Sequence, residues 1–579
     1  MALSVAPALV WLLAGRPDTT GPGGQPNHAT ISIVGTTDLH GRIFAVDGRG
    51  GLALLGGYLA NLRAARAADG GAVLLLDSGD TYQGGIESNL SEGAVVIDAY
   101  NTLGYTAAAI GNHDFEFGPV DAWDSTEAPA GDLRGALKAR AVQARFPFLA
   151  ANLREEGRPV AWPNVRPSVV VEAAGLEVGI VGVMTHDALS MTLAANVGGL
   201  AVSELAGTIE AEASRLRAGG ARVVVVASHA GGDCSAFGQP ADLTACDASA
   251  EMFEVARRLP RGLVDVIVAG HTHGAVAHEV NGTAIVQAYS WGRTFSRADV
   301  GVARGTGRVT GVRIFEPRYV CAREDGAGQC VPESASGSVV AHYEGPVAAD
   351  AAVEAAMAPA LRRVSALRST ALGAVLDTPV PRGSGDEESA LGNLFADALR
   401  DLAPGADAAI SYSTGPGGLR ADLAAGAATV GAFYDAYPFD NRVVRLTLTG
   451  AQLRQLLTAQ VRRPRWRGRA LGVSGLRTVV DCRAGELHVD VMRASGHPIA
   501  DRDTLSVAMP DFMAARAMTL GSSGDPVTAA ATLPQVRDVV AGWVRARGGR
   551  ISAAAFADPS RPRWQRTPAA TACLAQAPG

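Results

Sequence analysis

Residues 31–40, ISIVGTTDLH, join a short apolar run to an aspartate and a histidine that lie two positions apart. Such a run, rich in Ile and Val, is typical of a buried strand that is covered on both faces. At four later places an apolar run likewise precedes a short polar cluster. The runs at 73–76, 107–110, 223–226 and 264–268 precede Ser78-Gly79-Asp80, Gly111-Asn112-His113-Asp114, Ser228-His229-Ala230 and Gly270-His271-Thr272-His273.

The spacing of these runs predicts an α/β fold. Stretches with apolar residues near helical spacing, such as 52–68 and 202–218, alternate with the strand-like runs. If the runs lie side by side in one sheet, their C-terminal ends share an edge. That edge is where open α/β sheets bind their ligands, so we expect the polar residues to form one site.

The bulk composition indicates a folded enzyme-sized protein and excludes some partners. A chain of 579 residues with 47% apolar residues is too long for one core, and we expect two large domains. The net charge of −6 and the lack of a long Lys/Arg block argue against binding to a nucleic-acid polymer or an anionic membrane. No stretch after the N-terminal segment is long and apolar enough to span a bilayer.

The domain boundaries follow from changes in this pattern. We predict a start segment over 1–28, a first domain over 29–345, a connecting helix over 346–371 and a second domain over 372–579. The tail after residue 559 is expected to wrap the surface or to be loose, unless Cys573 holds it.

Two features favour export to the periplasm or the cell exterior. Residues 2–15 are apolar and precede a Pro/Gly/Thr-rich stretch, as in a secretory signal, although the basic start of a signal is missing. The alternative is a disordered start. The six cysteines lack CxxC spacing, and their positions suggest loop staples 234–246 and 321–330, which leaves 482 with 573. This is one of 15 pairings, and six reduced thiols are the alternative.

The polar clusters have the composition of a dinuclear metal site. Two adjacent cations need terminal ligands for each and one ligand shared by both. Asp38 and His40 supply one hard and one imidazole ligand, and Asp80 can bridge. A mixed N/O set suits Zn, Mn, Fe or Co better than Ca or Mg, and it is completed by Asn112, His229, His271 and His273.

The ordered series D-x-H, G-D, G-N-H-[DE], S-H and G-H-x-H resembles the calcineurin-like metallophosphoesterases. The longer forms TTDLHGRI, LLDSGDTYQG, AAAIGNHDFEFG and VAGHTHG are similar to the branch of 5′-nucleotidases and 2′,3′-cyclic phosphodiesterases. The resemblance implies a sandwich domain followed by a C-terminal α/β domain, and a metal-bridging hydroxide as nucleophile. It implies one metal at Asp38, His40, Asp80 and His273, and another at Asp80, Asn112, His229 and His271.

By the same resemblance, His113 is the catalytic imidazole, which stabilises charge or protonates the leaving alkoxide. The family orients this histidine with an acidic residue three positions later, usually Asp, and here that residue is Glu116. Asn112 is expected to contact substrate as well as metal. Arg42 and Asp114 have no ligand role in the family, so we expect them to make local hydrogen bonds.

The later half resembles the nucleotide-recognition domain of the same branch. Leu391-Gly392-Asn393, Gly417-Gly418-Leu419-Arg420 and Tyr437-Pro438-Phe439-Asp440-Asn441 are similar to its LGN, GG-[IV]-R and PFxN motifs. The resemblance assigns Arg420, Phe439 and Asn441 to substrate binding, with the arginine gripping substrate and the phenylalanine stacking on the base. The alternatives are a core role for Phe439 and a surface ion pair for Arg420.

Three departures weaken the predicted base preference. Ala390 replaces an Asn, segment 414–416 lacks another Asn, and segment 522–527 lacks the second stacking aromatic. Loss of one stacking face would cost roughly 1 to 3 kcal/mol of base affinity. Phe512 is a candidate replacement, with core packing as the alternative reading.

The sequence therefore predicts an exported metal-dependent phosphoesterase that hydrolyses nucleotides as a 5′-nucleotidase does. One alternative keeps the metals and acts on 2′,3′-cyclic nucleotides or nucleotide sugars, and a related subfamily acts on a sulfur-linked sulfonate. An alternative of another class is a surface binding protein that has lost turnover.

Overall fold

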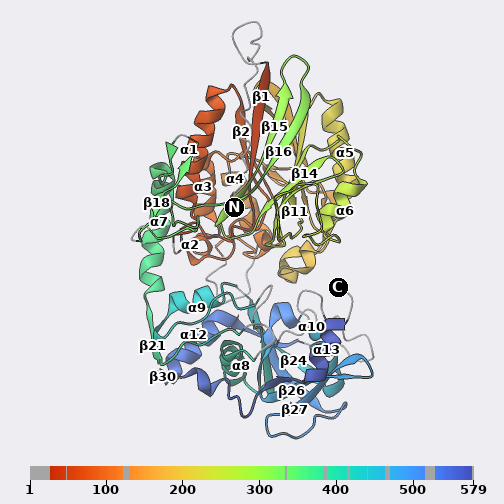
Figure 1. The fold of residues 1–579 in the computed structure, drawn as a ribbon. Helices are drawn as coiled ribbons and strands as arrows, with labels where there is room; N and C mark the ends of the chain where they lie inside the picture. The colour runs from red at the N-terminus through yellow and green to blue at the C-terminus, as the bar shows by residue number, and fades with distance from the viewer. Residues whose placement is uncertain are drawn as a thin grey trace, which may run out of the picture.

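The computed structural model describes residues 27–576 with gaps at 47, 122–130, 333–334, 344, 384–387, 414–417, 440, 463–469 and 515–528. Only the backbone is described at 529–533, 572 and 574–576. The start segment 1–26, Gly417, Asp440 and the departures at 414–416 and 522–527 lie outside the described residues. The described chain forms two lobes joined at one side by a long helix (Figure 1).

The first lobe contains two facing sheets. One has the order β16 (Arg308–Tyr319), β15 (Thr294–Ala303), β1 (His28–Thr36), β2 (Ala72–Asp77), β3 (Ala107–Ala109), β4 (Phe148–Leu149) and β7 (Val165–Arg166). The other has the order β13 (Ala275–Val280), β14 (Thr283–Ala288), β12 (Val266–Ala269), β11 (Val223–His229), β9 (Leu176–Met184) and β8 (Ser168–Ala173). A small sheet of β10 (Leu200–Val202), β5 (Leu153–Glu155) and β6 (Arg158–Pro159) flanks them.

The five predicted strands divide between the two sheets, as the sandwich implied by the family resemblance requires, and do not share the one sheet considered from the apolar runs alone. β1, β2 and β3 pair in parallel in one, and β11 and β12 pair in parallel in the other. The apolar residues that face inward, such as Ile33, Leu76, Val225 and Val268, form a core between the sheets. Because this core aligns the two sheets, the C-terminal ends of all five strands still meet at one end of the lobe.

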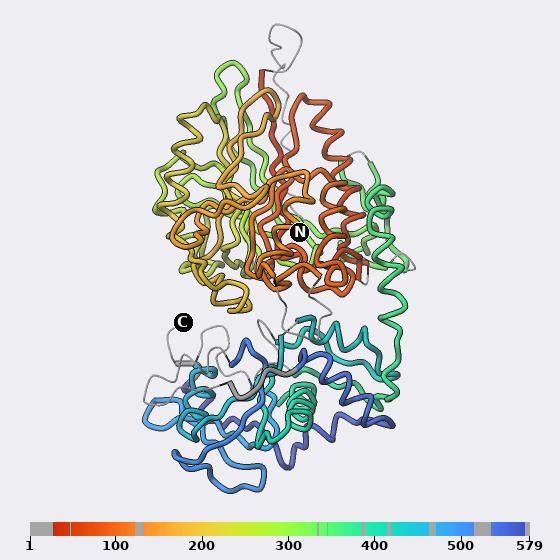
Figure 2. Tube along the Cα trace, turned by 180° about the vertical axis from the view of Figure 1, so that it is seen from behind, coloured from red at the N-terminus to blue at the C-terminus, as the bar shows by residue number. Residues whose placement is uncertain are grey.

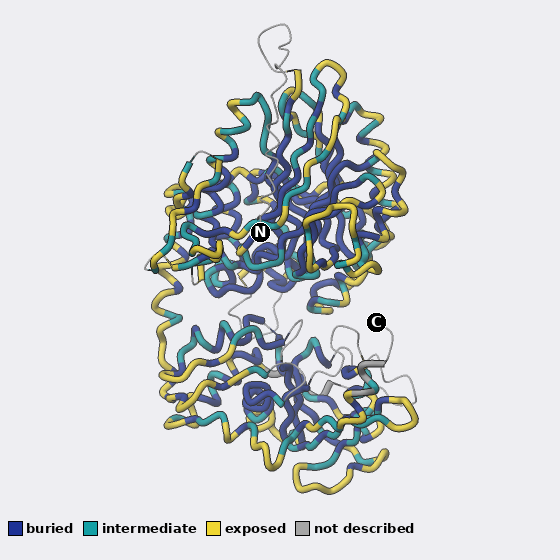
Figure 3. Tube along the Cα trace, viewed as in Figure 1, coloured by how far each residue is buried: buried dark blue, intermediate teal, exposed yellow. Residues whose placement is uncertain are grey.

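Helices cover both outer faces and complete a four-layer sandwich, as the fold prediction required (Figure 1). On one side lie α1 (Leu52–Ala68), α2 (Ile86–Asn89), α3 (Ala94–Leu103) and α4 (Gly135–Gln143). On the other lie α5 (Leu205–Ala218) and α6 (Glu251–Arg258). The central strands β1, β2, β3, β11 and β12 are almost entirely buried, whereas β16 at the edge of its sheet is not (Figure 3). This burial explains why the sequences of the central strands are apolar on both faces.

The connection to the second lobe is α7 (Ala351–Arg368), which runs along one side of the molecule (Figure 2). The side chain of Asp350 caps its first turn by accepting hydrogen bonds from the N–H groups of Ala352 and Val353. Its buried face packs against α3 in the first lobe and α9 (Val430–Ala436) in the second. Among the described residues, no helix is both long enough and apolar enough to cross a membrane.

The second lobe is built on a five-stranded sheet in the order β25 (Gly472–Ser474), β22 (Ala408–Ser411), β28 (Thr504–Pro510), β24 (Arg442–Thr449) and β29 (Ala529–Gln535). Smaller sheets are formed by β23 (Gly426–Thr429), β21 (Ala371–Leu376) and β30 (Gly549–Ile551), and by β27 (Glu486–Arg493), β26 (Leu476–Arg483) and β31 (Trp564–Arg566). Two cores lie on either side of the main sheet, beneath α8 (Ala390–Leu402), α10 (Gly450–Arg462), α12 (Val536–Arg547) and α13 (Pro568–Gln576).

All six cysteines form the predicted disulfides, Cys234–Cys246, Cys321–Cys330 and Cys482–Cys573. The last bond joins β26 to α13, and β31 adds a parallel strand to β26. The tail is therefore held by both a covalent bond and a strand, as the prediction for a bonded Cys573 required.

Loss of the Cys482–Cys573 bond is expected to destabilise the second lobe more than loss of the Cys234–Cys246 bond destabilises the first. Sequence separations of 91 and 12 residues correspond, in the loop-entropy model, to about 4.6 and about 2.8 kcal/mol. Urea unfolding of the two double Cys→Ser variants checks this. Equal losses would show that loop length does not govern these bonds.

Candidate metal centre

The predicted ligands lie in the loops that leave the C-terminal ends of the central strands. Five of them have a positive φ that non-glycine residues rarely adopt, namely Asp38, His40, Asp80, His271 and His273. A hydrogen-bonded frame imposes these conformations, since the N–H groups of Asp38 and His40 bond to the carbonyls of Gly79 and Asp80. Such strain is typical of functional sites held by their surroundings.

The ring of His40 is oriented by a backbone carbonyl. Its Nδ1 lies 3.0 Å from the carbonyl oxygen of Gln83, which can only accept, so Nδ1 carries the proton. Nε2 then presents a lone pair into the site, 3.1 Å from Nε2 of His273 and 3.8 Å from Oδ2 of Asp80. His40 is thus prepared to bind a cation through Nε2.

His229 is oriented in the same way. Its Nδ1 donates to the carbonyl oxygen of Ser78 at 2.8 Å, which leaves a lone pair on Nε2. This atom lies 2.9 Å from Oδ1 of Asn112 and 3.3 Å from Oδ2 of Asp80. Asn112 uses its amide N–H to reach the carbonyl of Met191 at 2.8 Å, so its oxygen faces the site.

The histidines of the last loop join these two arrangements. Nδ1 of His271 lies 3.1 Å from Oδ1 of Asn112 and 3.2 Å from Nε2 of His229. Nε2 of His273 lies 3.5 Å from Oδ1 of Asp38. Two compact groups result, and within each the ligand atoms lie within 4.8 Å of one another: Asp38, His40 and His273, and Asp80, His229 and His271.

The geometry fits two cations. Within each group the facing atoms are electron-pair donors, and lone pairs at about 3 Å repel unless a proton or a metal ion lies between them. Burial raises the pKa of Asp38 to about 7, and the Asp80 charge adds to this rise. Burial would also raise the pKa of Asp80, but the neighbouring His229 and His113 hold it well below its usual range.

His113 lies beside the two groups without joining them. It follows β3 at the start of a single 3₁₀ turn, His113–Phe115, and its backbone N–H donates to Oδ1 of Asp80 at 2.8 Å. Its Nδ1 lies 2.6 Å from Oε1 of Glu116, so Nε2 is directed away from this carboxylate. Burial would lower the pKa of His113, but the Glu116 and Asp80 carboxylates raise it.

The second lobe presents its predicted substrate residues to this centre. Phe439 is buried at the edge of a second-lobe core, as its core alternative expected, and its ring centroid also lies 6.0 Å from that of His113. The Arg420 guanidinium lies 5.2 Å over the Phe439 ring. Burial lowers the pKa of Arg420 to about 10, while the Glu116 carboxylate favours its charge. Among the described residues, no side chain forms an ion pair with Arg420, which argues against the alternative of a surface ion pair.

The domain interface contains a group of ion pairs that could not be predicted from the sequence. Arg42 was expected to bond locally, but Nη1 lies 3.3 Å from Oδ1 of Asp435 in the second lobe. Arg368, at the end of α7, pairs with the same Asp435 and with Glu87 of the first lobe at 3.1 Å. The correction for Arg42 follows from tertiary packing, since its partner lies 393 positions away. Asp114 does bond locally, to the N–H groups of Thr81 and Gly111.

Other predicted residues of the second lobe have structural contacts. Asn441 accepts a hydrogen bond from the Tyr437 hydroxyl at 3.0 Å and donates to Asp511 at 2.9 Å, so it orders its own turn. Its contact with substrate stays a prediction. Phe512 packs against the second core beside Tyr412, as the core interpretation expected.

Trp291 lies at the mouth of the centre and was not singled out from the sequence. Its backbone N–H donates to the carbonyl of Asp38 at 2.8 Å, and the ring of this half-buried residue lies 6.3 Å from that of His273. Arg293 covers the ring at 4.3 Å. Its positive φ of 67° is the same signal that marks five of the predicted ligands, and it is visible only in the structure.

Comparison with known proteins agrees with this architecture. Residues 31–275 match the calcineurin-like phosphoesterase family, and residues 371–519 match the family described as 5′-nucleotidase, C-terminal domain. Together the two matches cover more than half of the chain.

Individual relatives extend the match over nearly the whole chain. Protein UshA of Yersinia enterocolitica is 25% identical over 568 residues, which cover 91% of this chain and 90% of that protein. Endonuclease YhcR of Bacillus subtilis is 25% identical over 92% of this chain, and the chain spans only 41% of its length. The crystal structure of a 5′-nucleotidase precursor from Thermus thermophilus superposes with a TM-score of 0.69, at 23% identity, over 93% of this chain and 99% of that one.

The domain order, the converging strand-end ligands and both family matches lead to the same conclusion. The chain belongs to the calcineurin-like phosphoesterases, in the branch that carries a 5′-nucleotidase C-terminal domain.

Proposed function

We propose that the protein is an exported metal-dependent phosphoesterase that releases phosphate from nucleotides. The observation that carries the proposal is the pair of ligand groups with His113 beside them, and with Phe439 and Arg420 of the second lobe next to His113. A phosphate at the metal centre would be within reach of the arginine, while an attached base would extend toward the second lobe.

Seven side chains would hold the two divalent ions, and their mixed N/O ligand set suits Zn, Mn, Fe or Co. Asp38, His40 and His273 form one half and Asn112, His229 and His271 the other, with Asp80 between them. When bound, two such ions lower the pKa of a water molecule and neutralise charge on the phosphoryl group.

The protein's own residues supply the remaining chemistry. Because Nδ1 of His113 is fixed by Glu116, protonated His113 carries a transferable proton on Nε2, which it can donate to the leaving oxygen. Arg420 matches phosphoryl oxygens with paired N–H donors, and the Phe439 face is available for stacking once substrate separates it from its neighbours.

Three disulfides support export, because such bonds persist in oxidising compartments. The structural neighbour from Thermus thermophilus is itself described as a precursor. Mass spectrometry of the mature chain in a periplasmic or culture-fluid fraction tests this. Intact protein with free thiols in the cytoplasm would contradict it.

Hydrolysis of a panel of substrates, followed by phosphate release and by chromatography of the nucleoside and nucleotide products, tests the proposed activity. AMP, other nucleotides, 2′,3′-cyclic nucleotides and nucleotide sugars are incubated with protein reloaded with Mn or Zn, and with chelated protein as the control. We expect hydrolysis of nucleoside monophosphates only in the metal-loaded samples. Conversion of 2′,3′-cyclic nucleotides or nucleotide sugars to nucleoside monophosphates, in preference to hydrolysis of AMP, would instead favour the phosphodiesterase or pyrophosphatase alternative. Well under one equivalent of metal and no turnover would favour a binding protein.

Replacing Arg420 with alanine is expected to lower kcat/KM for AMP by roughly 10- to 100-fold, since a hydrogen bond to a charged group contributes about 1.5–3 kcal/mol. R420K should recover part of this loss, because it keeps the charge without the paired donors. Steady-state kinetics measure both. R550A, which removes an exposed arginine of the same lobe, is the control. Unchanged kinetics in R420A would assign the arginine a structural role only.

A further inference from the structure

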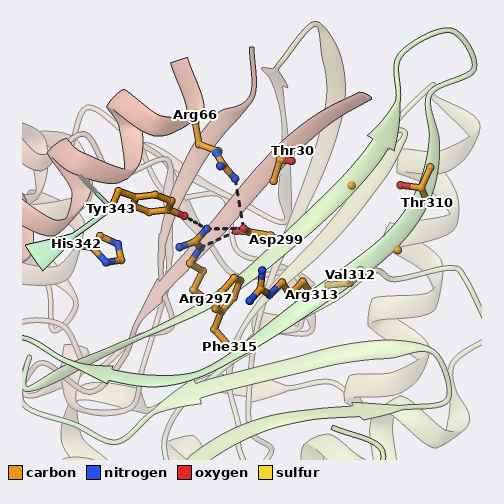
Figure 4. Close-up of a pocket in the computed structure, with 12 residues that line it drawn as sticks. Thr30, Arg66, Arg297, Asp299, Thr310, Val312, Arg313, Phe315, His342 and Tyr343 are labelled. Atoms are coloured by element: carbon orange, nitrogen blue, oxygen red, sulfur yellow. Dashed lines mark hydrogen bonds and ion pairs between the residues drawn. The ribbon is translucent and has the colours of Figure 1, made fainter. Parts of the chain in front are cut away.

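A second pocket lies in the first lobe, on the sheet face toward α1, away from the metal loops (Figure 4). Its volume is about 760 Å³, within the range of sites for nucleotide-sized molecules. Three adjacent strands form its floor, and the register places Thr30, Gly301 and Gly311 in one row and Ser32, Asp299 and Arg313 in the next.

The floor is open at Gly311 of β16, whereas a Cβ added at its partner Gly301 on β15 would lie 2.8 Å from Oγ1 of Thr310. A Cβ added at Gly311 would meet nothing within 4 Å, and the backbone there has no positive φ. Neither packing nor conformation therefore requires glycine at this position. Its effect is to leave room above the sheet, between the side chains that surround it.

The walls carry an excess of positive charge. Three guanidinium groups, of Arg66, Arg297 and Arg313, surround the single carboxylate of Asp299. Arg297 binds that carboxylate through two N–H groups, at 2.8 and 2.5 Å, and Arg66 approaches it at 3.5 Å. Arg66 also pairs with Asp69, outside the pocket, at 2.7 Å.

Arg313 differs from the other two arginines. It lies opposite Asp299 in the strand pairing, yet its guanidinium rests 4.7 Å over the Phe315 ring, and no acidic side chain among the described residues pairs with it. Nε of Arg66 and Nε2 of His342, both buried, also have no hydrogen-bond partner there. Buried groups such as these two nitrogens normally have a partner, whereas Arg313 is exposed and free to meet a ligand.

Part of this cluster has an evident structural role. Arg297 donates to the Tyr343 hydroxyl and lies over the rings of Phe315 and Tyr343, and this attaches the segment around β19 (Ala341–His342) and β20 (Gly345–Pro346) to the sheet. Arg313 and Gly311 take no part in that attachment. Their arrangement calls for a different explanation.

We propose that this pocket binds a phosphate-bearing small molecule, at a site separate from the metal centre. Guanidinium groups bind phosphate oxygens through paired N–H donors, and the hydroxyls of Thr30 and Thr310 add two more donors. The phosphate lies over the glycine floor beside Arg313, and the remaining volume holds the organic group against the exposed ring of Tyr343.

The inference does not depend on the proposed activity. The test is equilibrium dialysis of the metal-loaded full chain against a non-hydrolysable phosphonate analogue of AMP and, in a separate arm, inorganic phosphate. R313A removes the unpaired donor, and G311V fills the floor. Each should bind one equivalent less than the wild type, or bind that equivalent at least about 10-fold more weakly.

R308A, which removes an exposed arginine on the same strand but outside the pocket, should bind as the wild type does. The proposal is judged by the difference in bound analogue between the wild type and each variant. If the metal centre fails to bind the analogue, the amount bound falls equally in every protein and this difference does not change. Equal affinity for phosphate and analogue would show that the pocket recognises the phosphate group. Tighter binding of the analogue would show that the organic group also contributes to binding. Unchanged binding in both R313A and G311V would overturn the proposal.

Discussion

Asp80→Asn is expected to abolish metal binding and turnover together. Oδ2 of Asp80 lies 3.3 Å from Nε2 of His229 and 3.8 Å from Nε2 of His40, so this carboxylate faces an imidazole of each ligand group. The amide introduced by the substitution would direct its N–H groups at the Nε2 lone pairs of His229 and His40, and it would occupy the space in which the cations bind. Metal affinity should fall by more than the roughly 10- to 100-fold that follows loss of an outer partner.

The same substitution should leave the fold intact. Oδ1 still accepts the backbone N–H of His113, and the new amide satisfies the imidazoles that the carboxylate faced. Metal analysis, phosphate release from AMP and thermal unfolding are measured together, with D187N as a control at an exposed carboxylate. Full metal content in D80N would refute the bridging assignment.

His113→Gln should lower kcat by about 10²- to 10⁴-fold, the usual contribution of a general acid, while metal content stays at the wild-type level. Turnover can be lost without loss of metal because His113 contacts Asp80 through its backbone N–H, whereas its ring is hydrogen-bonded to Glu116. Glu116→Gln keeps the hydrogen bond but removes the charge, so its loss should be smaller.

The leaving group distinguishes the two roles open to His113. If the imidazole protonates the departing alkoxide, H113Q should impair AMP hydrolysis more than hydrolysis of p-nitrophenyl phosphate, whose leaving anion needs no proton. Equal impairment would indicate stabilisation of charge on the phosphoryl group. H186Q, at an exposed histidine, is the control. A wild-type kcat for H113Q with both substrates would exclude either role.

Local sequence predicted the strands and the site because the relevant signals are short. The helix at 52–68 was predicted to the residue, and the connecting helix expected over 346–371 is observed as α7 (Ala351–Arg368). Each proposed ligand follows its strand within a few positions, so strand ends that meet bring the ligands together. The two-sheet arrangement followed from the family resemblance and not from the strands themselves, since an apolar run does not specify which sheet it joins.

Contacts between residues that are far apart in the sequence could not be predicted from the sequence. Asp435 pairs with Arg42 only because α7 places the second lobe beneath the metal loops, and the pocket of Arg66, Arg297 and Arg313 combines a helix with two strands. No motif links such positions.

The sequence by itself determined the chemistry of this protein, because strand-end aspartates and histidines carry their chemical types wherever the strands meet. The tertiary structure alone decided the directions in which those side chains point. Backbone carbonyls at Gln83 and Ser78 fix the lone pairs of His40 and His229, and packing of the two lobes brings Arg420 and Phe439 to His113. Hydrogen-bond directions and domain contacts depend on distances in space, which a linear pattern does not contain.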